Sequence, residues 1–118
     1  IQELSTCKQY HLPIKLVNLN NRYMGMVRQW QEFFYGNRYA ESYMDALPDF
    51  VKLAEAYGHV GMRIESKEEL RPAMEKAFAL KDRLVFMDIV VDPHEHVYPM
   101  HIAPGSLRDM WLSKTERT

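Results

Sequence analysis

Two adjacent asparagines, Asn20 and Asn21, occupy the point in this sequence where chemistry is most expected. They follow a short apolar run at residues 14–19 and precede a segment with helical spacing that begins at Gly25. Because open α/β sheets hold ligands just beyond the carboxyl ends of their strands, a junction of strand, loop and helix is a natural binding site. An asparagine carbonyl oxygen there could bind a hard cation such as Mg²⁺, with a backbone carbonyl of the same loop as a second ligand.

The same pair also has a simpler interpretation as a turn. Asparagine tolerates positive φ, and its side chain hydrogen-bonds to nearby backbone, so two asparagines after a strand are common turn residues. The pair by itself does not distinguish a turn from a cation site. The longer sequence around it must decide.

Other residues that could do chemistry give weaker indications. His94, His96 and His101, with Glu95 between the first two, are possible zinc ligands. In an extended segment, however, successive side chains point to opposite sides, so the three adjacent side chains would not converge and we do not expect a metal centre there. Cys7 has no histidine or carboxylate next to it in the sequence that would activate its thiol, so we expect a buried, unreactive side chain.

The elements that must position these residues alternate between helix and strand. Strand patterns occur at residues 14–19, 59–64 and 84–91, and helical patterns at residues 2–10, 25–35, 48–57 and from 66 onward. This alternation predicts an α/β fold with parallel strands and right-handed crossovers. Residues 84–91 are apolar at nearly every position, as parallel strands covered on both faces are, and Asp88 is the exception.

Local signals define the ends of the helices. Ser66 and Glu69 have the spacing of a capping box, and Gly58 is a typical helix stop. Pro72 falls inside the helix that follows Ser66, so we expect a local bend or a later start. The segment after Gly25 has the apolar stripe of an amphipathic helix, formed by Met26, Val27, Trp30, Phe33 and Phe34.

Length and composition exclude several classes of protein. The 118 residues and 47% hydrophobic content suffice for one domain with one core. A net charge of −1 gives no field that would attract nucleic acid or an anionic membrane, and no apolar run is long enough for a membrane span. A single cysteine and the lack of a leader pattern before Ile1 favour a soluble protein of the cytoplasm. An initial Ile in place of Met also suggests a piece of a longer chain.

The longer sequence around the asparagine pair resembles a known family. The string NLNNRYMGMVRQWQ at residues 18–31, and PDFVKLAEAYG at residues 48–58, resemble the large catalytic subunit of acetohydroxyacid synthase (acetolactate synthase). The segments EHVYPM at residues 95–100 and MWLSKTERT at residues 110–118 resemble the C-terminus of the bacterial form. The likeness extends over nearly the whole chain. It implies a thiamine diphosphate (TPP) enzyme of branched-chain amino-acid biosynthesis.

The resemblance also implies roles for individual residues. The side chain of Asn21 and the main-chain carbonyl of Tyr23 match the Mg²⁺ ligands of the TPP motif, and Gly25 and Met26 match residues beside the cofactor. Val27, Trp30 and Phe34 match the substrate pocket and channel, with Trp30 shaping the pocket for the second substrate. No residue of this chain matches a catalytic acid or base.

The family motif opens with Gly-Asp-Gly upstream of the asparagine pair, and this chain does not contain it. The resemblance therefore implies that residues 1–92 are part of a TPP-binding domain, and that residues 93–118 are a tail covering the active-site channel. The intact enzyme would decarboxylate pyruvate and condense the hydroxyethyl unit with pyruvate or 2-oxobutyrate. We expect residues 1–118 alone to be inactive and to retain neither TPP nor Mg²⁺.

The resemblance implies partners as well: a second copy of the subunit bound through this domain, a small regulatory subunit, and 2-oxo acid substrates. Neither nucleic acid nor membrane is expected. Two alternatives remain at this point. The chain could belong to another TPP-dependent decarboxylase or oxidase, or it could be a non-catalytic α/β binding module that uses the amide loop without chemistry.

Overall fold

The computed structural model describes residues 1–102 and 105–116. The chain divides into two compact units. The first comprises Ile1–Tyr23 and Tyr43–Pro93, and the second comprises Met24–Ser42 and His94–Thr118. The first unit contains the parallel sheet, and the second contains one helix and a short hairpin.

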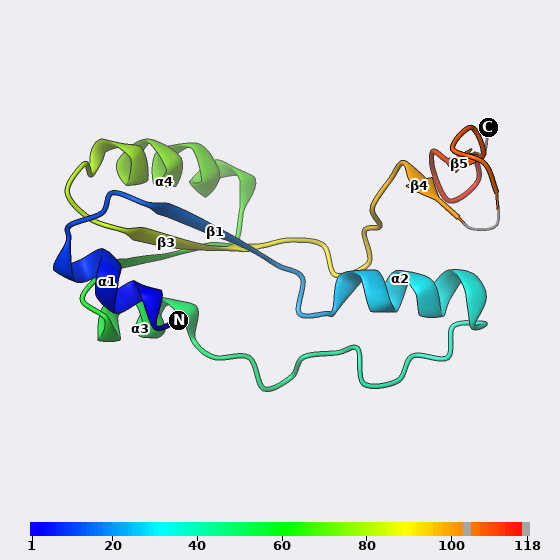
Figure 1. Ribbon diagram of the computed structural model, residues 1–118, viewed down its shortest axis with the longest axis horizontal. Coiled ribbons are helices and arrows are strands. Elements are labelled where there is room, and N and C mark those ends of the chain that lie inside the picture. Colours follow the sequence, from blue (N-terminus) through cyan, green and yellow to red (C-terminus); the bar gives the residue numbers. More distant parts are fainter. Residues whose placement is uncertain (103–104, 117–118) are drawn as a thin grey trace. The chain divides into compact units, whose positions relative to one another are not determined.

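The first unit is a three-stranded parallel sheet with helices on both faces, which confirms the predicted α/β class (Figure 1). Its strands lie in the order β1-β3-β2. The strands are β1 (Lys15–Asn20), β2 (Val60–Ile64) and β3 (Val85–Val90). The helices are α1 (Glu3–Gln9), α3 (Phe50–Ala56) and α4 (Lys67–Ala79). Each strand and helix lies within a few residues of the range that the sequence predicts.

Two apolar clusters, one on each face of the sheet, make the core of this unit. On one face α1 and α3 pack against β3 through Leu4, Cys7, Ala54, Leu84 and Phe86. On the other face α4 packs through Ile64, Ala77, Val85 and Met87. Side chains alternate along β3, so odd positions face α4 and even positions face α1 and α3. Asp88 therefore lies on the face that α1 and α3 cover.

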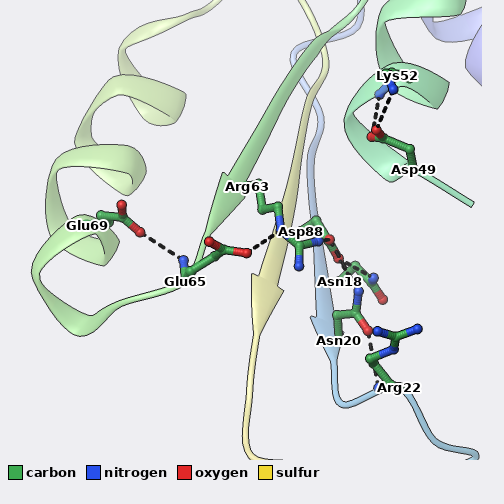
Figure 2. Close-up of polar contacts among 9 residues, drawn as sticks. All are labelled: Asn18, Asn20, Arg22, Asp49, Lys52, Arg63, Glu65, Glu69 and Asp88. Carbon is green, nitrogen blue, oxygen red and sulfur yellow. Dashed lines mark hydrogen bonds and ion pairs between the residues drawn. The ribbon is translucent and has the colours of Figure 1, made fainter. Parts of the chain in front are cut away.

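The helix caps follow the sequence. The side chain of Ser66 accepts from the backbone N–H of Glu69, whose carboxylate accepts from the N–H of Ser66, and so the predicted capping box is present. Asp49 caps α3 by accepting from the N–H of Lys52 (Figure 2). Pro72 lies within α4, yet the helix begins at Lys67 directly after its cap. The later start that we considered for this helix does not occur.

Gly61 in β2 allows α3 to approach the sheet closely. A Cβ atom at this position would lie 2.8 Å from both the Cα and the carbonyl oxygen of Val51, which real Cβ atoms do not do. Because those atoms belong to the backbone of α3, the helix would have to move away from the sheet to accommodate a side chain. The register of β2 places Gly61 beside Phe86 and Arg63 beside Asp88.

The second unit is built around α2 (Gly25–Phe34). The side-chain amide of Gln29, which is 1% exposed, donates to the carbonyl of Val97 at 3.1 Å and accepts from the N–H of Val97 at 2.8 Å. The ring of Phe33 lies 4.9 Å from that of Trp111. Antiparallel strands β4 (Met100–His101) and β5 (Met110–Trp111) form a hairpin that the sequence analysis did not predict. Its two strands are too short to show a period.

Candidate functional site

The loop that leaves β1 holds the asparagine pair in a defined turn. The side-chain oxygen of Asn20 accepts from the N–H of Arg22 at 3.2 Å, and that of Asn21 accepts from the N–H of Tyr23 at 3.1 Å. Arg22 has a positive φ of 58°, a conformation that costs a non-glycine residue about 1–2 kcal/mol. The turn interpretation of the two asparagines is therefore correct for the backbone, and both amides shape this loop.

A second segment of the first unit braces the loop. Tyr23 and Tyr43 form an antiparallel bridge, and their rings meet edge to face at 5.1 Å. The N–H of Met44 donates to the carbonyl of Arg22 at 2.8 Å, and the guanidinium of Arg22 lies over the ring of Tyr43 at 5.5 Å. A small cavity of about 150 Å³ adjoins the loop, with Asn21, Tyr23 and Met44 in its wall.

Asp88 lies at the centre of a polar network behind this loop (Figure 2). Its side chain is 1% exposed, and it accepts from Asn18 at 2.7 Å. It also accepts from the Asn20 amide, at 3.1 Å to Oδ1 and 3.2 Å to Oδ2. Arg63 of β2 donates to Oδ2 at 2.8 Å. All three strands thus contribute to one buried carboxylate.

The arginine in this network is only half-buried and serves two carboxylates. It pairs with Glu65 at 2.7 Å as well as with Asp88. The hydrogen bond to Glu65 is the main cause that raises the pKa of Arg63, and the charges of Glu65 and Asp88 raise it further. Burial acts in the opposite direction. A buried carboxylate needs a counter-charge and hydrogen bonds, and Arg63, Asn18 and Asn20 supply them to Asp88. The sequence showed Asp88 as an exception in an apolar strand but did not show its partners.

Three of the predicted site residues, one assigned to the cofactor and two to the substrate pocket, lie together on α2 in the second unit. Met26, Val27 and Trp30 line an apolar cavity of about 560 Å³, and the ring of Phe34 contacts Trp30 edge to face at 5.1 Å. Gly25 is the first residue of α2. Asn21 and Tyr23 belong to the first unit. The predicted site residues are thus distributed over both units.

The opposite side of α2 carries a charged cluster that sequence reasoning missed. Glu32 is 10% exposed, and its carboxylate contacts Lys114 at 2.5 Å, His96 at 3.1 Å, the Tyr39 hydroxyl at 3.1 Å and Arg28 at 3.3 Å. Burial of Glu32 opposes its ionisation, but hydrogen bonds from Lys114, His96 and Tyr39 outweigh burial and lower the pKa of Glu32 to about 2. We call these five residues the Glu32 cluster.

The described residues include no group of three or more histidine, cysteine, aspartate or glutamate side chains that could hold a metal ion. The Asn21 amide and the backbone carbonyl of Tyr23 are both oxygen donors, the chemistry that Mg²⁺ prefers. These two donors fit part of a magnesium site.

Comparison with known proteins identifies the family. The sequence model described as "Thiamine pyrophosphate enzyme, C-terminal TPP binding domain" matches residues 1–89, which include β1, the asparagine loop and most of β3. The chain belongs to this family. The TPP-binding domain predicted from the asparagine motif is therefore confirmed.

Curated relatives narrow the resemblance to one enzyme. The domain is 58% identical to the acetolactate synthase isozyme 3 large subunit of Escherichia coli, over 100% of this chain and 21% of that protein. It is 52% identical to the acetolactate synthase large subunit of Haemophilus influenzae, over 98% of this chain and 20% of that protein. The chain thus spans about a fifth of the length of these relatives, and the predicted resemblance to the large subunit is confirmed.

A solved structure supports the fold. The domain superposes on a thiamine diphosphate-dependent 4-hydroxybenzoylformate decarboxylase of Rhodococcus jostii with a TM-score of 0.68 and 26% sequence identity, over 75% of this chain and 16% of that protein. Among the described residues, no helix is both long enough and apolar enough to cross a membrane.

Proposed function

We propose that this chain serves as the TPP-binding domain of an acetolactate synthase large subunit. The whole of that large subunit, including this chain, is called the complete subunit below. That enzyme would decarboxylate pyruvate and join the remaining two-carbon unit to pyruvate or 2-oxobutyrate. The observation that carries the proposal is the 58% identity to an acetolactate synthase large subunit over the whole of this chain. The alternative of another TPP-dependent decarboxylase has weaker support, since the decarboxylase of similar fold is only 26% identical.

In this proposal the loop after β1 would hold the Mg²⁺ ion that accompanies the diphosphate of the cofactor. Asn21 would supply its side-chain oxygen, and Tyr23 its backbone carbonyl. The hydrogen bond from the Tyr23 N–H to Asn21 and the bridge to Tyr43 fix both groups in one turn. TPP, when bound, supplies the electron sink that decarboxylation of a 2-oxo acid requires.

The apolar cavity on α2 would receive the second 2-oxo acid. Its walls at Met26, Val27 and Trp30 are apolar and suit the alkyl end of such a substrate. Trp30 and Phe34 support each other through their edge-to-face contact, which limits the positions the indole can take. The protein would thereby orient the acceptor and exclude water, while no side chain of this chain transfers a proton.

The remaining parts of the proposal concern assembly. The complete subunit would pair with a second copy through this domain and would bind a small regulatory subunit. Residues 93–118 would cover the active-site channel. In the second unit, Val97, Met100 and Lys114 of this segment are attached to α2 through Gln29 and Glu32, which supports a tail that remains in place during catalysis.

The proposal is tested by acetolactate formation from pyruvate in the complete subunit, with added TPP and Mg²⁺. We expect the activity to require both additions and to be lost in Asn21→Ala. Asn37→Ala is the control, because Asn37 is an asparagine in an exposed turn of the second unit and lies outside the loop after β1. A folded complete subunit that forms no acetolactate, or an Asn21→Ala variant as active as wild type, would contradict the proposal.

A further inference from the structure

The carboxylate of Asp88 determines which way the neighbouring Asn20 amide points. An ionised carboxylate can only accept hydrogen bonds, so every group that contacts it must present a donor. Asn20 contacts both oxygens of Asp88 through Nδ2. The amide oxygen of Asn20 is then turned away from Asp88, and it accepts from the N–H of Arg22. With the amide reversed, an oxygen would face the carboxylate and an NH₂ group would face the N–H of Arg22.

The bond that Asn20 makes to Arg22 matters because the loop is strained at that residue. Arg22 adopts a left-handed φ of 58°, and such conformations persist only where the surroundings enforce them. The backbone N–H of Arg22 is held by Asn20, and its carbonyl by the N–H of Met44. Asn21 and Tyr23 flank Arg22, so the conformation of Arg22 sets where their oxygen atoms point.

We propose that Asp88 is a positioning residue for the magnesium loop, acting through Asn20 and Arg22 to aim the oxygens of Asn21 and Tyr23. This inference rests on the proposed function, in which those two oxygens bind Mg²⁺. Arg63 belongs to the same network of residues, because its ion pair with Asp88 at 2.8 Å balances the negative charge of that carboxylate. Groups that orient metal ligands in this way commonly change metal affinity by about 10- to 100-fold when they are removed.

Asn18 provides the matched control. Like Asn20, it lies on β1, on the same face, and donates to Asp88. The side-chain amide of Asn18 donates to Asp88, whereas the side chain of Asn20 contacts both Asp88 and the backbone of the loop. A merely structural role for the network predicts similar effects of removing either amide. A positioning role predicts that only Asn20 affects the metal.

The experiment titrates Mg²⁺ into the complete subunit with TPP in excess and determines the Mg²⁺ concentration at which TPP binding is half-maximal. Tryptophan fluorescence detects the binding. Thermal unfolding without Mg²⁺ and TPP is the second readout. For Asn20→Ala we expect an increase of about tenfold or more in half-saturating Mg²⁺, the size of effect seen for groups that orient metal ligands. For Asn18→Ala we expect a loss of thermal stability similar to that of Asn20→Ala. Half-saturating Mg²⁺ should increase by less than about threefold, because the side chain of Asn18 does not hold the loop that carries the proposed Mg²⁺ ligands.

Asp88→Asn tests the positioning role of Asp88 while preserving the volume of its side chain. This variant decides whether Asp88 positions the magnesium loop if Asn20→Ala fails to fold. Because Asn20 contacts both oxygens of Asp88, either orientation of an amide at position 88 places an NH₂ group against its donor. We therefore expect Asp88→Asn also to raise half-saturating Mg²⁺ by about tenfold.

Four outcomes would overturn the inference. The first is equal increases in half-saturating Mg²⁺ for Asn18→Ala and Asn20→Ala. The second is wild-type Mg²⁺ dependence in Asp88→Asn together with lowered thermal stability, which would make the network purely structural. The third is an Asn21→Ala variant with wild-type Mg²⁺ dependence, which would remove the proposed metal site itself. An effect of Asn21→Ala without any effect of Asn20→Ala refutes this inference alone and leaves the proposed function intact.

Discussion

Replacing Glu32 by glutamine should release the C-terminal segment from α2. The carboxylate accepts from Lys114 and His96 of that segment, and it also contacts Arg28 and Tyr39. Glutamine keeps the volume but has one oxygen in place of two, and its NH₂ group would face cationic donors. The buried Arg28 and His96 side chains would then lose their anionic partner.

The magnitude follows from the pKa. The cluster lowers the pKa of Glu32 from 4.5 to about 2, and each pKa unit is worth about 1.4 kcal/mol. The ionised form therefore contributes about 3 kcal/mol to the folded second unit at pH 7. Because the folded pKa lies below the unfolded one, this contribution is complete above about pH 4.5 and is lost as the pH falls toward 2. At pH 3 less than half should remain.

Hydrogen exchange measured by mass spectrometry provides the assay, with peptides that cover residues 94–102. At pH 7, Glu32→Gln should lower protection there by about 100-fold, the equivalent of roughly 3 kcal/mol, while residues 85–90 of β3 keep theirs. The difference between variant and wild type should shrink at pH 3, after correction for intrinsic exchange rates. Glu75→Gln is the control, because Glu75 is 70% exposed and its ion pair with Arg71 spans 3.8 Å.

Two results would refute this reasoning. One is unchanged protection of residues 94–102 in Glu32→Gln at pH 7. The other is a wild-type advantage that stays constant from pH 7 to pH 3, since only ionisation of Glu32 gives the expected pH dependence.

Four further predictions concern other parts of the chain. Gly61→Ala should lower the free energy of unfolding by about 1–3 kcal/mol in urea titration, because its Cβ would overlap the backbone of Val51. Ser66→Ala should cost about 1 kcal/mol in the same titration through loss of the α4 cap. In the complete subunit, Trp30→Leu should reduce the preference for 2-oxobutyrate over pyruvate by roughly 10-fold or more, and an unchanged product ratio would exclude its role in selecting the acceptor. Residues 1–118 alone should show no micromolar TPP binding by calorimetry, because Asn21 and one carbonyl leave most Mg²⁺ positions to water.

The sequence determined the elements and their class because those depend on local patterns. The apolar run of β3, the capping box at Ser66 and the helical stripe after Gly25 each use neighbours within a few residues, and all three elements form where predicted. The family also followed from sequence, since the string around Asn21 is long enough to be specific. The turn role of the two asparagines was likewise accessible from residue type alone.

Only the tertiary structure decided what the isolated charges do. Asp88 stood out in an apolar strand, but its partners come from strands that are 25 and 70 residues away along the chain. Glu32 appeared as one polar residue on a helix, and its contact with Lys114 spans 82 residues. Periodicity carries no information on such pairs. A buried carboxylate must collect donors from whatever elements the fold brings beside it, so its partners become known only when strand order and helix packing are fixed.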